Sequence, residues 1–271
     1  MSFSFTILGS GSSGNCTLLQ HNGYHLLIDA GLSGRETCRR LAALGVAPES
    51  VRGILLTHEH QDHIQGLAGL TRRFRMPVFA GSATLDALRP GSPISAAEPI
   101  ACGQEFVLGG MSIQPFSISH DCADPMAFLI RADGLQLGFA MDLGYISGLV
   151  RERLLGCDAL VLESNHDLEM LKAGPYPWEL KQRVLGRLGH LSNEAVAQFL
   201  EKDFDGRARH IVLAHLSQNN NHPDLAVLSA RRALLGRGIQ EEEVDRRVRL
   251  SFQHRVSETI RPDEENNRRD Q

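Results

Sequence analysis

Short runs of hydrophobic residues, separated by polar turns, fill the first part of the chain and predict strands. FSFTIL (3–8), CTLLQ (16–20) and YHLLID (24–29) have the length and composition of buried or half-buried strands. The tripeptide HNG between the last two is typical of a hairpin turn. RETCRRLAALG (35–45) then repeats its hydrophobic positions at helical spacing and ends on Gly45, which suits a helix C-terminus.

The middle of the chain continues with strands and contains one clear helix. Hydrophobic or alternating runs predict strands at 51–57, 77–81, 105–108, 111–119, 126–132 and 135–141. GLAGLTRRF (66–74) has helical spacing and runs up to Pro77, a residue that cannot continue a helix. A stretch rich in Pro, Gly and Ala, from Pro90 to Gly103, is expected to be a loop.

The last part of the chain alternates helices with strands and ends in a polar tail. The pattern predicts helices at 146–156, 194–204 and 224–236, and strands at 158–164, 210–216 and 248–252. We expect a single domain over 1–262 and a disordered tail over 263–271. Because each half has strands followed by helices, the prediction is an α/β fold of the α+β type, a four-layered αββα sandwich, rather than one doubly wound parallel sheet.

The glycine-rich stretch GSGSSG (9–14) needs its context to be interpreted. It matches G-x-G-x-x-G, and Asp29 lies 20 residues after Gly9, which is nearly the spacing of a dinucleotide-binding fingerprint. That fingerprint requires a helix directly after the glycines, because the helix N-terminus binds the pyrophosphate. Here a predicted hairpin follows instead. We therefore expect a tight loop between two antiparallel strands.

Composition narrows the classes of protein. A formal net charge of −4 gives no overall basic field for nucleic acid or anionic membrane, although a local cationic groove can coexist with an acidic total. No hydrophobic run reaches the ~20 residues of a membrane helix, and no basic residue precedes the first run as in a signal peptide. Five scattered cysteines without C-x-x-C spacing are typical of reduced thiols. We expect a cytoplasmic protein with no membrane partner.

The strongest chemical signal is THEHQDH, which contains His58, His60, Asp62 and His63 and stands between a predicted strand and a predicted helix. Histidines two apart at a strand end point to the same side, and the turn into the helix brings the next two side chains round to face them. Three imidazoles and a carboxylate within six residues are typical of a metal site. The motif therefore predicts metal binding.

With this motif the sequence resembles the metallo-β-lactamase superfamily. Members have an Asp after an early strand, the H-x-H-x-D-H motif, and then a His, an Asp and a final His at strand ends; Asp29, His120, Asp142 and His215 stand at these positions. The resemblance implies one metal ion on His58, His60 and His120, a second on Asp62, His63 and His215, Asp142 bridging the two, and Asp29 orienting a histidine ligand. An Asp at 142, where the zinc β-lactamases carry a Cys, argues against β-lactam hydrolysis.

Longer segments resemble the YycJ/WalJ group within that superfamily. They are TILGSGSSGN (6–15), the stretch from ESNHD to GHLSN (163–193) and LAHLSQNNNHP (213–223). The group is related to ribonuclease Z and the phosphoribosyl cyclic phosphodiesterases, and is associated with exonuclease activity, 5′→3′ on DNA. The resemblance therefore implies a phosphodiesterase with two divalent metal ions.

The resemblance also implies which residues carry the reaction. Glu163, His190 and His215 match an acid, a His and a final His that follow the fourth motif in this branch. A hydroxide bridging the two metals would attack phosphorus, and His190, held by Glu163, would protonate the leaving oxygen. The expected catalytic residues are Asp62, His190 and Glu163. Ser192, Asn193 and His166 are candidates for contact with substrate, although Ser192 and Asn193 also fit a simple helix N-cap.

Three classes of function stay open. The first is a nuclease acting on nucleic-acid ends, DNA ends in particular. The second is a small-molecule hydrolase of the same fold, such as a cyclic phosphodiesterase or, more distantly, a lactonase or thioesterase. The third is a non-catalytic metal or redox-sensing module, which the complete ligand set disfavours. Zinc is the first choice of ion, with manganese and iron as alternatives. Arg72, Arg73 and Arg75 fit either a phosphate-binding patch or a solvated helix face, and a homodimer is one open option for the assembly.

Overall fold

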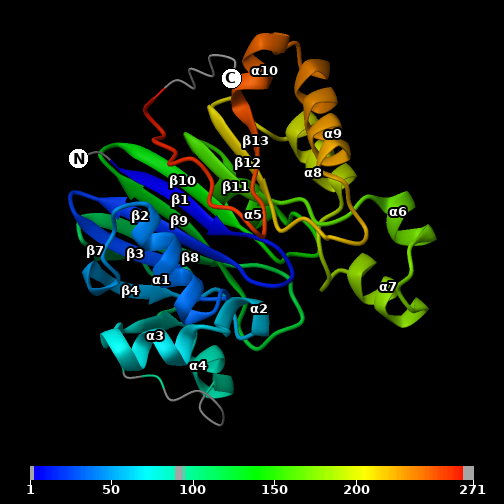
Figure 1. The fold of residues 1–271 in the computed structure, drawn as a ribbon. Helices are drawn as coiled ribbons and strands as arrows, with labels where there is room; N and C mark the ends of the chain where they lie inside the picture. Colours follow the sequence, from blue (N-terminus) through cyan, green and yellow to red (C-terminus); the bar gives the residue numbers. More distant parts are fainter. Residues whose placement is uncertain (1–2, 89–93, 95, 265–271) are drawn as a thin grey trace.

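Two β-sheets stack face to face, and helices cover the outer face of each (Figure 1). The structure is a computed structural model that describes residues 3–88, 94 and 96–264. The first sheet has the order β1 (Ser4–Gly9), β2 (Cys16–His21), β3 (Tyr24–Ile28), β4 (Val51–Leu55), β5 (Val78–Ala80), β6 (Ala97–Pro99). The second has the order β13 (Val248–Leu250), β12 (His210–Ala214), β11 (Ala159–Glu163), β10 (Leu135–Ala140), β9 (Met126–Ala132), β8 (Met111–Ser117), β7 (Phe106–Leu108).

The helices divide between the two outer layers. A layer of α1 (Gly34–Ala43), α3 (Leu67–Phe74) and α4 (Ser82–Leu88) packs hydrophobic residues against the first sheet, and α2 (Gln61–Ile64) lies at its edge. The second sheet is covered by α5 (Gly148–Leu154), α8 (Asn193–Lys202), α9 (Pro223–Gly236) and α10 (Glu241–Arg247). Two further helices, α6 (Leu168–Ala173) and α7 (Trp178–Leu185), project from the body (Figure 1). These layers confirm the predicted αββα sandwich.

A hydrophobic core joins the two sheets. It takes Phe5 and Ile28 from the first sheet and Phe128, Phe139 and Val161 from the second, all fully buried. Burying one such side chain contributes roughly 1.5–3 kcal/mol, so a core of this kind holds the sheets in fixed relation. β9 shows the resulting alternation, because Phe128 and Ile130 face this core while Ala127 and Leu129 belong to the core under the helices of the second sheet.

The N-terminal hairpin and glycine loop form as the sequence predicts. β2 and β3 are antiparallel, and Asn22 and Gly23, with φ of 48° and 79°, make the tight turn between them. β1 and β2 are also antiparallel, so GSGSSG is the loop between two antiparallel strands. Within it Gly14 has φ of 152°, and a Cβ there would lie 2.5 Å from the carbonyl oxygen of Gly31. A side chain has no room at this point.

The prediction of a loop over Pro90–Gly103 is wrong in part. Residues 97–99 form β6, which pairs in parallel with β5; residues 90–93 and 95 lie outside the described residues. β6 is exposed along its whole length and sits at the sheet edge, so backbone pairing alone defines it. The hydrophobic pattern also did not predict the short helices α4, α6, α7 and α10.

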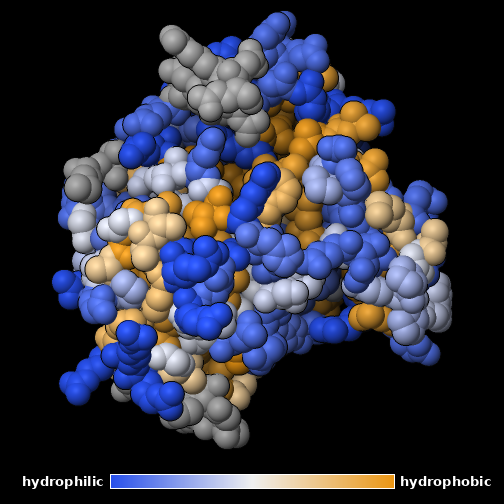
Figure 2. Space-filling view, viewed as in Figure 1, coloured by the Kyte–Doolittle hydropathy of each residue, from blue (hydrophilic) through white to orange (hydrophobic). Residues whose placement is uncertain are grey.

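The C-terminal segment ties the two sheets together. β13 pairs with β12 in the second sheet, and a few residues later Ile260 exchanges backbone hydrogen bonds with Phe5 in the first. In the predicted tail, the backbone oxygen of Glu264 accepts a hydrogen bond from His210 Nε2 at 3.0 Å. Residues 265–271 lie outside the described residues. Figure 2 shows a mostly hydrophilic face with scattered hydrophobic groups. Within the described residues, no helix combines the length and hydropathy needed to cross a membrane.

Candidate metal centre

The predicted site residues lie where strands end. β3 is parallel to β4, and β10, β11 and β12 are parallel to one another, so their carboxyl ends reach the same edge of the sandwich. At that edge the chain places Asp29 after β3, His58 after β4, His120 after β8, Asp142 after β10, Glu163 at the end of β11 and His215 after β12. Residues that are distant in sequence therefore converge at this edge.

Three of these residues have a left-handed backbone. Asp29, Asp142 and His215 have φ of 61°, 57° and 54°. Such a conformation costs about 1–3 kcal/mol in a residue with a side chain and persists only where other contacts impose it. The amide of Asp29 donates to Leu55 O at 2.9 Å, and that of His215 to Ser10 Oγ at 2.8 Å. At each of these three residues the chain turns sharply out of its strand.

His58, His60 and His120 form the first cluster of possible ligands. Their ring nitrogens lie within 4.8 Å of one another. His120 Nδ1 donates to Gly189 O at 3.2 Å, which leaves Nε2 for the site. His58 Nε2 is buried without a hydrogen-bond partner among the described residues. Burial, together with the nearby His63, holds the pKa of His58 well below its usual range, so the ring is neutral, as a metal ligand must be.

Asp62, His63, Asp142 and His215 form an adjoining cluster. Asp62 Oδ2 lies 3.5 Å from His63 Nε2 and 3.4 Å from His215 Nε2. Asp142 Oδ2 lies 3.0 Å from His63 Nε2, and Oδ1 lies 2.7 Å from His215 Nδ1. Asp142 also groups with His58 and His63, so it stands between the two clusters, where a bridging ligand would be.

Asp29 fixes the ring of His63. Its Oδ2 lies 2.8 Å from His63 Nδ1, while Oδ1 accepts the amide of Thr57 at 2.8 Å. Complete burial raises the pKa of Asp29, and the neighbouring His63 acts in the opposite direction. Because the carboxylate accepts a hydrogen bond from the Nδ1–H group, Nε2 of His63 faces the other ligands. A carboxylate behind a histidine ligand is the usual way to orient the ring.

Glu163 holds His190 beside the clusters. Its Oε1 lies 2.7 Å from His190 Nδ1, and Oε2 accepts the amides of Leu143 and Leu191, each at 3.0 Å. Burial acts to lower the pKa of His190, but the charges of Glu163 and Asp142 outweigh it and hold that pKa above its usual value. The ring is one-fifth exposed, so its other edge is accessible.

The family model described as "Beta-lactamase superfamily domain" matches residues 24–216. The chain belongs to the metallo-β-lactamase superfamily. It is 37% identical over 241 residues to the exodeoxyribonuclease YycJ of Bacillus anthracis, covering 88% of this chain and 91% of that protein. It is 37% identical over 229 residues to the exodeoxyribonuclease WalJ of Streptococcus pneumoniae, covering 83% of this chain and 85% of that protein. The resemblance to the YycJ/WalJ group is thereby confirmed.

Solved structures of the superfamily share the fold. The metallo-β-lactamase fold protein YhfI from Bacillus subtilis superposes with a TM-score of 0.71 over 95% of this chain and 99% of its own, at 18% identity. A diphosphatase from the PhnP family gives a TM-score of 0.66 over 96% and 98%, at 17% identity. At these identities the likeness concerns the fold alone.

The donor set fits the divalent ions that the superfamily implies. His58 Nε2 is buried without a hydrogen-bond partner among the described residues, and the buried Asp142 Oδ2 and His215 Nε2 have only ion-pair contacts with other candidate ligands. Unpaired buried polar atoms are costly, and bound cations would satisfy all three. Imidazole nitrogens with carboxylate oxygens suit zinc and also accept manganese or iron.

Asn15 is a site residue that the sequence did not single out. It is fully buried, and its Nδ2 lies 3.1 Å from His63 Nε2 and 3.2 Å from Asp62 Oδ2. Its Oδ1 accepts the amide of Gly11 at 2.9 Å. The glycine loop thus brings an amide against two candidate ligands. The only signal was position, since Asn15 directly follows glycines that allow a close approach.

The three candidates for substrate contact are held by the fold. Ser192 is the N-cap of α8 and accepts the amide of Ala195 at 3.1 Å. Asn193 is buried, accepting from Ser164 Oγ at 2.7 Å and donating to Asn221 Oδ1 at 2.8 Å. His166 is buried beside them, and burial lowers its pKa to about 4. The N-cap alternative therefore accounts for the hydroxyl of Ser192.

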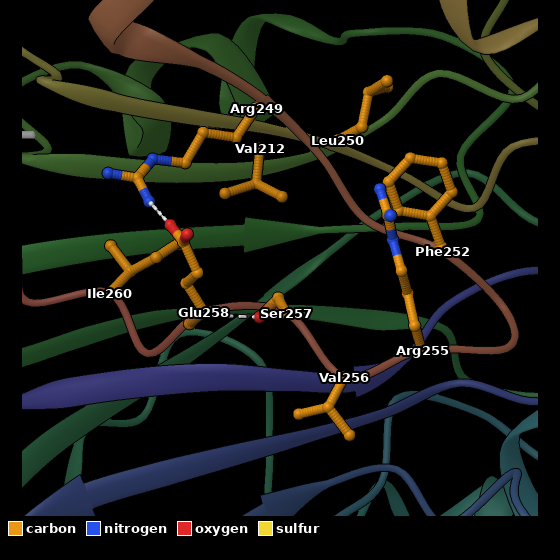
Figure 3. Close-up of a pocket in the computed structure, with 9 residues that line it drawn as sticks. All are labelled: Val212, Arg249, Leu250, Phe252, Arg255, Val256, Ser257, Glu258 and Ile260. Carbon is orange, nitrogen blue, oxygen red and sulfur yellow. Dashed lines mark hydrogen bonds and ion pairs between the residues drawn. The ribbon is translucent and has the colours of Figure 1, made fainter. Parts of the chain in front are cut away.

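A separate pocket of about 290 Å³ lies under the C-terminal segment (Figure 3). None of the metal-ligating candidates lines it. Its cations already have partners: Arg249 Nη1 lies 3.3 Å from Glu258 Oε2, and the Arg255 guanidinium stacks 3.6 Å from the centre of the Phe252 ring. The pocket is therefore a structural feature, distinct from the metal centre.

Proposed function

We propose that this chain is a dinuclear metal-dependent phosphodiesterase that acts as an exodeoxyribonuclease, with 5′→3′ polarity. The observation that carries the proposal is the convergence of two ligand clusters on Asp142, with the His190–Glu163 pair beside them. The two relatives named as exodeoxyribonucleases match nearly the whole chain, which favours DNA as the substrate class. The proposal takes residues 1–262 as one domain, because the ligands come from both sheets.

Each ligand cluster has its assigned ion. His58, His60 and His120 would hold one ion, Asp62, His63 and His215 would hold the other, and Asp142 lies between the two sets. Bound there, the ions would supply Lewis-acid chemistry and lower the pKa of water towards neutrality. Asp29 and Asn15 keep the ligands in place. Zinc is the ion we assign first, and manganese or iron is the alternative for the cluster with two carboxylates.

His190 is the general acid of the proposal. Its Nδ1 proton is accepted by Glu163, so a second proton on Nε2 is available to the substrate. A water molecule loses one proton to the solvent, and the oxygen of the resulting hydroxide joins phosphorus. As the P–O bond to the leaving oxygen breaks, His190 gives its Nε2 proton to that leaving oxygen. Glu163 stays ionised throughout, because it also accepts two backbone amides.

A panel of substrates tests the proposal. The purified chain is compared on 5′-phosphorylated duplex DNA, single-stranded DNA, short RNA and bis(p-nitrophenyl) phosphate, with and without Mn²⁺, beside the Asp142→Ala variant. We expect mononucleotides from DNA, a metal requirement, and no activity in the variant. Hydrolysis of the small ester without hydrolysis of any polynucleotide would contradict the proposed nuclease activity. Hydrolysis of a lactone or thioester, with no phosphodiester cleaved, would reject phosphodiester chemistry altogether.

A further inference from the structure

Arg183 on α7 is joined to the metal centre through one carboxylate. Its Nε lies 2.5 Å from Asp121 Oδ2. Asp121 directly follows His120, and its Oδ1 lies 3.6 Å from His120 Nε2 and 3.9 Å from His60 Nε2. One carboxylate therefore separates the guanidinium from two nitrogens assigned to a metal ion.

The remaining guanidinium nitrogens of Arg183 are open. The side chain is 55% exposed, and among the described residues only Nε has a hydrogen-bond partner. An arginine fixed by a carboxylate on one side presents its two terminal nitrogens in a planar fork on the other. That fork matches two oxygens of a phosphate group.

The C-terminal end of α7, which carries Arg183, is joined to the centre by hydrogen bonds. Val184 O accepts the amide of His190 at 3.0 Å. Gly189 O accepts from His120 Nδ1 at 3.2 Å. The end of α7 and the residues that follow it are therefore joined to the ring of a metal-ligand candidate and to the backbone of His190.

The local charge makes a cation necessary at this place. Asp29, Asp62, Asp121, Asp142 and Glu163 put five carboxylates in or beside the centre, and the chain as a whole has a formal net charge of −4. Metal ions offset this charge where the scissile phosphate binds. A neighbouring phosphate of a polynucleotide lies farther from the ions and gains less from their charge, so a cation beside the centre would strengthen its binding.

We propose that Arg183 binds a backbone phosphate next to the scissile one, and that Asp121 positions it. Asp121 stands between the guanidinium and the ligand nitrogens of His60 and His120, so Arg183 faces a different phosphate from the one at the metal ions. This inference rests on the proposed function, because only a polynucleotide has such a neighbouring phosphate. Arg183 is thus the residue by which the site prefers a nucleic-acid strand over a small diester.

Kinetics with two substrates test the inference. In Arg183→Ala, KM for an oligonucleotide should rise about tenfold or more. The negative slope of log affinity against log salt should become shallower by about 1. The loss on bis(p-nitrophenyl) phosphate, which has a single phosphate, should be at least tenfold smaller. Arg183→Lys should recover part of the affinity. Asp121→Ala should raise KM similarly, and the double variant should be little worse than Arg183→Ala.

Arg151→Ala is the matched control. Arg151 is 47% exposed and its Nε lies 3.2 Å from Asp203 Oδ2, so it repeats the Arg–Asp geometry away from the site. It should leave KM and the salt slope as in the wild type. An unchanged KM and slope in Arg183→Ala, or an equal loss on both substrates, would overturn the inference.

Direct binding separates this inference from the proposed function. The affinity for a fluorescein-labelled single-stranded oligonucleotide is measured in EDTA, where no hydrolysis occurs. Arg183→Ala should bind about tenfold more weakly than the wild type, and Arg151→Ala equally well. If the wild type cleaves no DNA, the nuclease proposal fails, and this binding ratio still decides for or against Arg183.

Discussion

His190 Nδ1 lies 2.7 Å from Glu163 Oε1, and the second oxygen of the same carboxylate accepts the amides of Leu143 and Leu191. The carboxylate is thus fixed by the backbone on one side and fixes an imidazole on the other. The ring has no freedom to rotate, and the proton available to a substrate is on Nε2.

The loss of kcat in His190→Ala should therefore depend on the leaving group of the substrate. We expect kcat on an oligonucleotide, whose alkoxide needs a proton, to fall about 10²- to 10⁴-fold. The p-nitrophenolate of bis(p-nitrophenyl) phosphate leaves without a proton, so kcat on that ester should fall far less. Elemental analysis should find the same metal content as in the wild type. Equal losses on the two substrates, or lost metal, would make His190 a ligand or a structural residue instead.

Asn15 should control how tightly the metal is held. In Asn15→Ala the Nδ2 donor beside Asp62 and His63 is lost, and removal of such a supporting contact typically costs 10- to 100-fold in metal affinity. The EDTA concentration that half-inactivates the variant should be lower by about that factor. Ser12→Ala, an exposed position in the same loop, is the control and should behave as the wild type. Equal chelator sensitivity of all three proteins would remove Asn15 from the site.

The contrast between THEHQDH and Asn15 shows what the sequence could predict. His58, His60, Asp62 and His63 are close in sequence, so their local spacing already implied a shared site. Asp142 and His215 were assigned from the resemblance to the superfamily, and the structure places each after one of the parallel strands that end at the same edge. Asn15 contacts Asp62 and His63, and Asp121 contacts Arg183, only because the fold brings these distant residues together.

The missed elements have a similar cause. α6 and α7 are short and stand outside the hydrophobic layers, and each has a single buried residue, Leu171 and Val184, so the hydrophobic periodicity is weak. β6 is exposed throughout and exists through pairing with β5. Patterns of hydrophobic residues predict elements that cover a core, and Arg183 belongs to one that does not.

Gly31 should tolerate no side chain. A Cβ at this position would lie 1.6 Å from Asp62 O and 2.5 Å from Asn15 N, both backbone atoms. We expect Gly31→Ala to lower the free energy of unfolding by about 3 kcal/mol or more. Gly69, in α3 with open space around it, is the matched position, and Gly69→Ala should add roughly 0.5–1 kcal/mol. Urea unfolding of the two variants and the wild type measures these free energies. A Gly31→Ala protein as stable as the wild type would contradict the tight packing around Gly31.

Glu36 should make stability depend on acid pH. Hydrogen bonds from Arg39, and then from Arg40, outweigh a partial burial that acts the other way and lower the pKa of Glu36 to about 2. A depressed folded-state pKa contributes stability above the unfolded pKa, and this is lost as pH falls towards the folded value. The difference in urea midpoint between the wild type and Glu36→Gln should therefore be full above about pH 5 and shrink towards pH 2. A difference that stays constant over this range would contradict the assignment.

The central claim is that two divalent ions in this centre make the chain a DNA phosphodiesterase. The most direct measurement is a titration of the chelator-treated protein with Zn²⁺ or Mn²⁺, counting bound ions by elemental analysis while recording nucleotide release from duplex DNA. We predict that release is absent without metal and reaches its maximum when two ions are bound per chain. Cleavage of DNA by the metal-free chain, or two bound ions without any phosphodiester cleavage, would contradict the claim.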